Sequence, residues 1–135
     1  MDLEAVVAEV RTALGTIDDL TTPEWGVQRI HSPAAVIALP ERIAYDQAYG
    51  RGSDLIEGLP VLVLVARPTS PEARREIAEY AAGSGPRSVK AAVEAHQYTA
   101  ADEVTVVSAE FDVVTYAGND YLAAQFNLEI VGRGA

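Results

Sequence analysis

Residues 104–131 read VTVVSAEFDVVTYAGNDYLAAQFNLEIV, and they carry the clearest β-strand pattern in the sequence. Two runs with a β-type pattern, 104–117 and 121–131, flank the triplet Gly118-Asn119-Asp120, which is typical of the short turn in a β-hairpin. In the second run, alternate residues separate into two faces. One face is apolar and consists of Leu122, Ala124, Phe126, Leu128 and Ile130. The other carries Tyr121, Gln125, Asn127 and Glu129. The sequence therefore predicts a long C-terminal hairpin with one buried face.

Three helices are predicted before the hairpin. Apolar residues at helical spacing predict a helix over 3–14, with Asp2 as the N-cap and Gly15 as the stop. The segment 69–72 (TSPE) predicts the start of a second helix, which runs to about residue 82. Either Thr69 and Glu72 form a capping box, or Ser70 caps a helix that begins at Pro71. The residues expected to be buried there are Ile77, Tyr80 and Ala81. A third helix is expected over about 87–96 and should bury Val89, Ala92 and Val93.

The strands lie apart from these helices along the chain. Residues 34–39 predict a short buried strand, 42–49 a second strand, and 25–30 a short strand of weaker pattern. The run 61–65 (VLVLV) is apolar on both faces, which favours a central strand. Because helices and strands are segregated, we expect an α+β fold in a single domain, 1–135. Its largely antiparallel sheet should pack against the N-terminal helix and the central pair of helices.

Composition excludes several classes of protein. The 135 residues include 20 acidic and 10 basic side chains, a formal charge of −10 that opposes binding to nucleic-acid phosphates. There are no cysteines, so disulfides and thiolate chemistry are excluded. The longest apolar run, 59–66, is far shorter than the roughly 20 residues of a membrane helix. The N-terminus is acidic where a signal peptide would be basic, so we expect a soluble, unprocessed chain.

No catalytic, cofactor or metal site is predicted. His31 and His96 have no second ligand at helical or strand spacing. The Gly50-x-Gly52 loop lacks the Lys-Ser/Thr of a phosphate loop. The carboxylate pairs 18–19 and 102–103 lie in polar, loop-like segments where ordinary pKa values are expected. A small enzyme or ligand-binding domain that uses the Gly50 loop as a lid stays an alternative, although no convergent polar groups are evident.

Six residues are candidates for contact with a partner. Three belong to the segment 49–54, because loops on a rigid scaffold often carry binding: Tyr49, Arg51 and Asp54. Three lie on the polar face of the hairpin: Tyr121, Gln125 and Asn127. For the tyrosines near the hairpin ends, packing against the sheet is an equally good interpretation.

Several stretches together resemble the tail-terminator family of long-tailed bacteriophages, particularly phages of actinobacterial hosts. They are 32–37 (SPAAVI), 45–46 (YD) followed by 50–54 (GRGSD), 61–67 (VLVLVAR), 83–94 (GSGPRSVKAAVE) and 118–124 (GNDYLAA). Their order and spacing are similar to the family pattern over about residues 30–131, whereas the N-terminal helix is similar only in type.

The resemblance implies a structural virion protein and no enzyme. Such a subunit forms a ring, hexameric in this family, that caps the tail tube, stops its polymerisation and joins it to the head-side connector. Genome DNA passes through the ring without specific binding. The protein would be assembled in the host cytoplasm and located at the head–tail junction of the virion. The nearest alternative is a head-closure or connector protein of the same neck.

Overall fold

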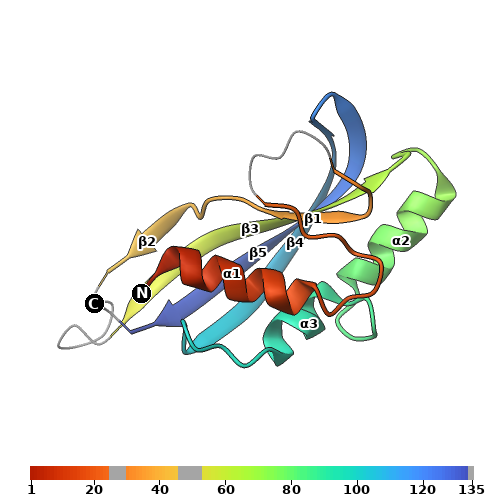
Figure 1. The fold of residues 1–135 in the computed structure, drawn as a ribbon. Coiled ribbons are helices and arrows are strands. Elements are labelled where there is room, and N and C mark those ends of the chain that lie inside the picture. The colour runs from red at the N-terminus through yellow and green to blue at the C-terminus, as the bar shows by residue number, and fades with distance from the viewer. Residues whose placement is uncertain (25–29, 46–52, 134–135) are drawn as a thin grey trace.

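The computed structural model describes residues 1–24, 30–45 and 53–133 (Figure 1). Within these ranges the chain forms an α+β fold, as the sequence predicts. The helices are α1 (Leu3–Leu14), α2 (Pro71–Ala81) and α3 (Val89–Ala95). The strands are β1 (Ala34–Ile37), β2 (Arg42–Ala44), β3 (Asp54–Ala66), β4 (Glu103–Tyr116) and β5 (Asn119–Gly132). None of the described helices combines the length and apolar character that a membrane crossing requires.

The strands form one antiparallel sheet in the order β1-β3-β5-β4, and β2 also pairs with β3. Since β5 occupies one side of β3, both β1 and β2 lie along its other side. Together they make one interrupted outer strand, and β4 is the outer strand at the opposite edge. Figure 1 shows α1 lying across the sheet, with α3 beside it and α2 nearer the turn of the hairpin.

All three helices bury their apolar stripes on the same face of the sheet. A single core cluster contains Val10 of α1, Tyr80 of α2 and Val93 of α3, packed against Val61 of β3 and Phe126 of β5. Full burial of an aliphatic or aromatic side chain stabilises a fold by about 1.5–3 kcal/mol. This face therefore supplies most of the hydrophobic stabilisation of the fold.

The predicted helix boundaries are largely confirmed. Asp2 caps α1 by accepting from the Ala5 N–H at 3.2 Å, and the helix ends at Gly15. Ser70 caps α2 by accepting from the Ala73 N–H at 3.1 Å, which decides between the two predicted caps. Two of the residues predicted to be buried, Ala81 of α2 and Ala92 of α3, are only partly buried. Ala73 of α2, which was not predicted, is buried.

Strand β3 is longer than the predicted run 61–65, since it begins at Asp54. Its first part pairs with β2. Its pairing with β5 shifts register at a bulge between Ile56 and Leu59. Strand β2 ends at Ala44, so the predicted strand 42–49 is too long at residue 45. Residues 46–49, and 25–29 of the predicted strand 25–30, lie outside the described residues.

The turn of the hairpin begins one residue earlier and ends two residues earlier than the predicted triplet 118–120. Tyr116 pairs with Asn119 and Thr115 with Asp120, so Asn119 and Asp120 belong to β5. The turn itself is Ala117-Gly118, with φ of 52° and 84°. Two successive positive φ values match the primed turns that suit the right-handed twist of a hairpin.

Ala117→Asn should stabilise the protein by about 0.5–1 kcal/mol, because Asn tolerates the left-handed conformation better than Ala. The midpoint of urea unfolding measures this effect. Ala109→Asn on β4 is the control and should not raise the midpoint. A lower midpoint for Ala117→Asn would contradict the assigned turn.

Candidate assembly surfaces

Of the three loop candidates, Tyr49 and Arg51 lie outside the described residues. Asp54 is the first residue of β3, and it is buried. Its Oδ2 accepts a hydrogen bond from the α-amino group of Met1 at 3.2 Å, and the two groups form an ion pair. Asp54 therefore joins α1 to the sheet within its own chain and does not face outward.

Tyr121 is buried as well, with 7% of its surface exposed. It packs with Val36, Leu64 and Ala123 in a small cluster on the face of the sheet that lacks helices. The structure therefore confirms the second interpretation of Tyr121, packing against the sheet.

Gln125 and Asn127 lie half-buried on that same face, as the alternation predicts. Gln125 Nε2 donates to Asn127 Oδ1 at 2.9 Å. Asn127 Nδ2 in turn donates to Ser108 Oγ at 3.0 Å and to Glu110 Oε1 at 3.2 Å. These bonds connect β5 to β4.

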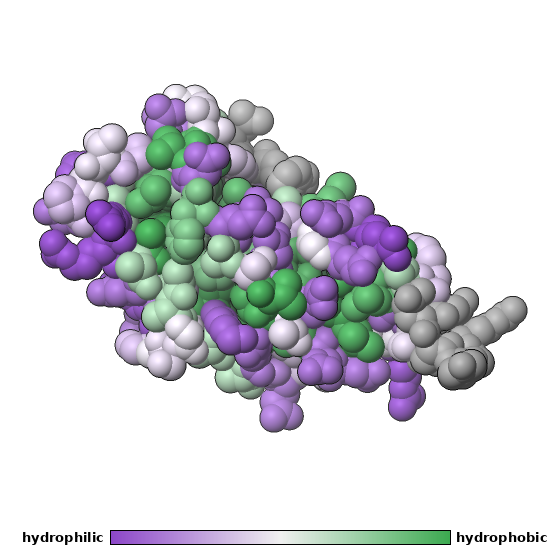
Figure 2. All heavy atoms as spheres, turned by 180° about the vertical axis from the view of Figure 1, so that it is seen from behind, coloured by the Kyte–Doolittle hydropathy of each residue, from purple (hydrophilic) through white to green (hydrophobic). Residues whose placement is uncertain are grey.

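Figure 2 shows the molecule from the side opposite to that of Figure 1. On this side, groups of hydrophobic side chains are surrounded by hydrophilic ones.

The largest exposed apolar side chains were not among the candidates. Phe111 and Val113 on β4 are 55% and 51% exposed. Both lie on the helix-bearing face, since they pair with Ala124 and Leu122 of β5. Their alternation with Glu110 and Asp112 along β4 is the signal in the sequence that points to them.

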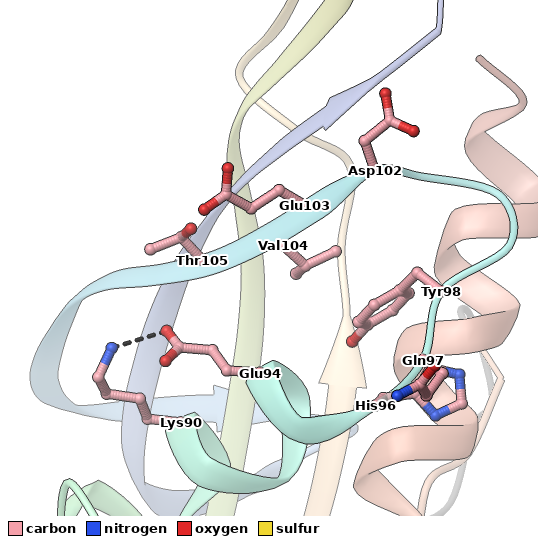
Figure 3. Close-up of a pocket in the computed structure, with 9 residues that line it drawn as sticks. All are labelled: Lys90, Glu94, His96, Gln97, Tyr98, Asp102, Glu103, Val104 and Thr105. Carbon is pink, nitrogen blue, oxygen red and sulfur yellow. Dashed lines mark hydrogen bonds and ion pairs between the residues drawn. The ribbon is translucent and has the colours of Figure 1, made fainter.

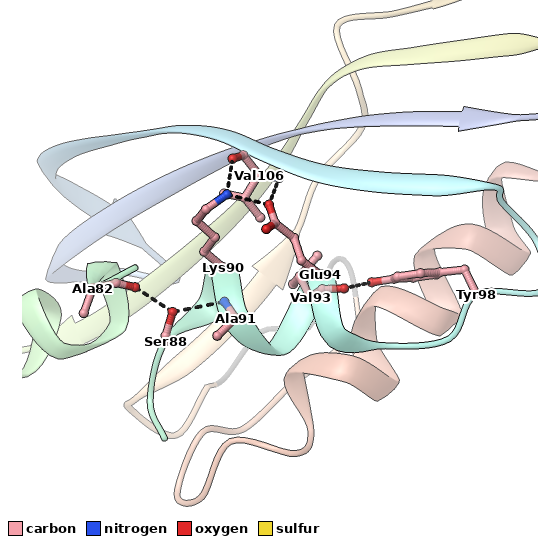
Figure 4. A network of polar contacts seen from close by, with 8 residues as sticks. All are labelled: Ala82, Ser88, Lys90, Ala91, Val93, Glu94, Tyr98 and Val106. Carbon is pink, nitrogen blue, oxygen red and sulfur yellow. Dashed lines mark hydrogen bonds and ion pairs between the residues drawn. The ribbon is translucent and has the colours of Figure 1, made fainter. Parts of the chain in front are cut away.

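The outer edge of β4 is covered only in part (Figure 4). At Val106 the N–H donates to Glu94 Oε2 at 2.9 Å, and the carbonyl accepts from Lys90 Nζ at 3.3 Å. Lys90 and Glu94 also bind each other at 2.6 Å. These contacts cover the edge near α3. Beyond Val106, from 108 to 116, no described strand pairs with this edge.

The opposite side of the molecule carries an amphipathic groove of about 470 Å³ between α1 and the β1–β2 connection. Leu3 and Val7 line one wall, and Leu39, which is 71% exposed, lines the other. The Arg11 guanidinium also lines the groove. It donates from Nη2 to the Thr22 carbonyl at 3.1 Å, while its buried Nε has no acceptor among the described residues.

A second pocket, of about 540 Å³, lies where the end of α3 meets the start of β4 (Figure 3). Its polar groups point in different directions. Glu94 binds Lys90, the Tyr98 hydroxyl donates to the Val93 carbonyl at 2.8 Å, and His96 Nε2 lies 3.7 Å from Glu9 Oε1. Each of these contacts holds α3 or its following loop in place.

Glu9 connects α1 to the loop after α3. Its carboxylate accepts from the N–H groups of Thr99 and Ala100 at 3.0 and 2.7 Å, and from the Thr99 hydroxyl at 3.2 Å. These bonds, the one from the Thr99 N–H first, hold the pKa of Glu9 below its ordinary value of 4.5. The charged form is therefore the one that the fold favours.

The stabilisation from Glu9 should depend on pH in a defined direction. Because the folded pKa is lowered, the contribution is complete above about pH 4.5 and is lost as pH falls through the folded pKa. Glu9→Gln should therefore be less stable than the unmodified protein near pH 6, and the difference should shrink toward pH 3. Urea unfolding across this range measures it, with Glu129→Gln on the exposed part of β5 as the control. A difference that grows toward acid would contradict the assignment.

Metal ligands do not cluster in the described ranges, where no group of three or more His, Asp or Glu side chains is placed to hold an ion. No family model matches the sequence, and no curated protein matches it significantly.

Proposed function

We propose that this chain is a tail terminator, a structural subunit of the phage neck without catalytic activity. In this proposal, copies of the chain form a ring that caps the tail-tube protein and stops its polymerisation. The tail-terminator family, which the sequence resembles, implies a ring of six. The ring joins the tube to the head-side connector and lets genome DNA pass. The protein is assembled in the host cytoplasm and resides at the head–tail junction of the virion.

The observation that carries the proposal is the order and spacing of the resembling stretches between residues 32 and 124. These stretches include strand β1, the second half of β3, the α2–α3 connection with most of α3, and the turn of the hairpin. The resemblance therefore involves the elements that define the fold. The α+β architecture is also the one that the resemblance implies.

Surface chemistry supports a role in assembly. The exposed apolar residues lie at two different edges of the sheet, as a ring built from head-to-tail contacts requires. The net charge of −10 favours passage of DNA over adhesion to it.

The lengths of tails assembled with and without the protein test this function. Without it, we expect tubes of excess and variable length that do not join heads, and adding the protein before assembly should restore normal length. Tubes of normal length that fail to join heads would instead favour the connector class. Normal, joined tails in its absence would overturn both neck assignments.

A further inference from the structure

We propose that the open half of the β4 edge, residues 108–116, binds an extended segment of a different protein as an additional strand of the sheet. The bound segment carries Lys or Arg side chains on one face and apolar side chains on the other. The inference does not depend on the tail-terminator proposal, because it rests on the backbone groups and the charges of β4 alone.

Every second residue of this edge points its backbone N–H and C=O away from the sheet. In a hairpin with a two-residue turn, the residues that flank the turn bond to each other, and here they are Tyr116 and Asn119. Residues 108, 110, 112 and 114 therefore bond to β5, and the backbone groups of residues 109, 111, 113 and 115 face outward. The Val113 N–H agrees with this direction, since it donates to Oδ1 of its neighbour Asp112 at 2.8 Å. An added strand binds outward-facing groups of this kind.

The two halves of the edge differ in how they are protected. Near α3, Glu94 and Lys90 bind the N–H and the carbonyl of Val106 at 2.9 and 3.3 Å, so these groups are not available to a further strand (Figure 4). Natural edge strands are commonly blocked by such contacts, by Lys or by Pro. Residues 108–116 contain neither Lys nor Pro, no described strand pairs with them, and residues 110–113 are all exposed. This half of the edge is therefore open.

The side chains along the open half indicate the chemistry of the added strand. Phe111 and Val113 lie on the helix-bearing face and are 55% and 51% exposed. Glu110 and Asp112 lie on the opposite face, and within the described part of the chain neither forms an ion pair. Directly opposite side chains of neighbouring strands share a face. Apolar residues of the added strand therefore contact the first pair, and its Lys or Arg residues contact the two carboxylates.

The same carboxylates disfavour a second copy of this chain as the occupant. An antiparallel pairing of two β4 strands centred on Phe111 would place Glu110 of each copy opposite Asp112 of the other. A pairing centred on Asp112 would place the two Asp112 side chains opposite each other. Like charges directly opposite each other destabilise a sheet, and the net charge of −10 adds repulsion between copies. A basic segment of a different protein meets neither penalty.

Synthetic peptides test the site. The probe is a labelled nonapeptide of alternating Val and Lys, and a nonapeptide of alternating Val and Glu has the same pattern with the opposite charge. In fluorescence anisotropy, we expect the Lys peptide to bind more tightly by about tenfold or more. A Lys peptide methylated on its backbone nitrogens keeps the charges but cannot donate hydrogen bonds, and it should lose binding. On addition of the unmethylated Lys peptide, amide hydrogen exchange should slow at residues 109, 111 and 115.

Substitutions in the protein locate the binding. The double variant Glu110→Lys with Asp112→Lys should weaken binding of the Lys peptide by about tenfold or more and should strengthen binding of the Glu peptide. Glu103→Lys with Glu129→Lys is the matched control, because it changes the net charge equally at exposed positions of β4 and β5 outside the open half. It should leave binding unchanged. Circular dichroism verifies that both double variants are folded.

Three results would overturn the inference. Equal binding of the methylated and unmethylated Lys peptides, or equal losses in the two double variants, would show attraction to the acidic surface as a whole and no added strand. A Lys peptide that does not bind at all would exclude the site. A dimer in sedimentation whose amides at 109, 111 and 115 are protected without peptide would assign the edge to a second copy. None of these results bears on the tail-terminator proposal, which the lengths of assembled tails test separately.

Discussion

Tyr80→Ala is expected to lower the free energy of unfolding by about 3–5 kcal/mol, as large-to-small changes of buried aromatic residues do. Tyr80 on α2 has no exposed surface and is the largest fully buried side chain in the described core. Its ring also lies 5.7 Å from the Arg87 guanidinium carbon, a cation–π contact. The substitution removes this packing and leaves a cavity between α2 and the sheet. Urea unfolding measures the loss.

Tyr80→Phe separates the contribution of the ring from that of the hydroxyl. The hydroxyl donates to Glu76 Oε1 at 3.5 Å, a long contact, and burial raises the pKa of Tyr80 to about 12, so the hydroxyl stays protonated. The loss in this variant should therefore be about 1 kcal/mol or less. Equal losses in the two variants would contradict the view that ring packing holds α2 on the sheet.

Ser88→Ala should destabilise the protein by about 2 kcal/mol, more than an ordinary helix cap contributes. The buried Ser88 hydroxyl accepts from the Ala91 N–H at 3.0 Å, which caps α3, and donates to the Ala82 carbonyl at 2.6 Å (Figure 4). The first bond starts a helix of only 7 residues, and the second fixes it to the end of α2. The substitution loses both bonds.

Ser70→Ala is the matched control for this prediction. Ser70 caps α2 in the same way, through the Ala73 N–H, but no second bond of its hydroxyl is found in the described part of the chain. Its loss should be about 1 kcal/mol, the usual value for a cap. Equal losses at Ser70 and Ser88 would show that the bond to Ala82 contributes nothing.

Much of the fold could be predicted because its signals are local. The apolar spacing of 3–14 and the capping residues Asp2 and Ser70 act within one helical turn, so they determine two helices directly. The hairpin follows from alternation, but its turn does not. Gly118, Asn119 and Asp120 all favour turns, and the final register depends on which residues pair across the strands. The full length of β3 could not be predicted, because it also depends on pairing with distant strands. Pro60 suggests a break in the strand, but in the structure it lies where the neighbouring strand changes from β1 to β2.

The assembly surfaces could be predicted less well, because exposure depends on how far the helices reach. Phe111 and Val113 have the same pattern as the buried positions of β5, and only the placement of α2 and α3 leaves them uncovered. Tyr121 has the residue type of an interface but packs against Val36 and Leu64 from other strands. Asp54 looks like a loop residue, and its partner is 53 positions away in the sequence. Such distant contacts leave no local pattern.

Electron microscopy of virions or purified tails, with this chain located in the density, tests the proposed terminator role. We expect a six-fold ring of this protein at the head-proximal end of the tail tube, in direct contact with the tube. Density on the capsid side, separated from the tube by another ring, would contradict the terminator assignment in favour of a connector. Absence of the protein from the particle would contradict the structural role altogether.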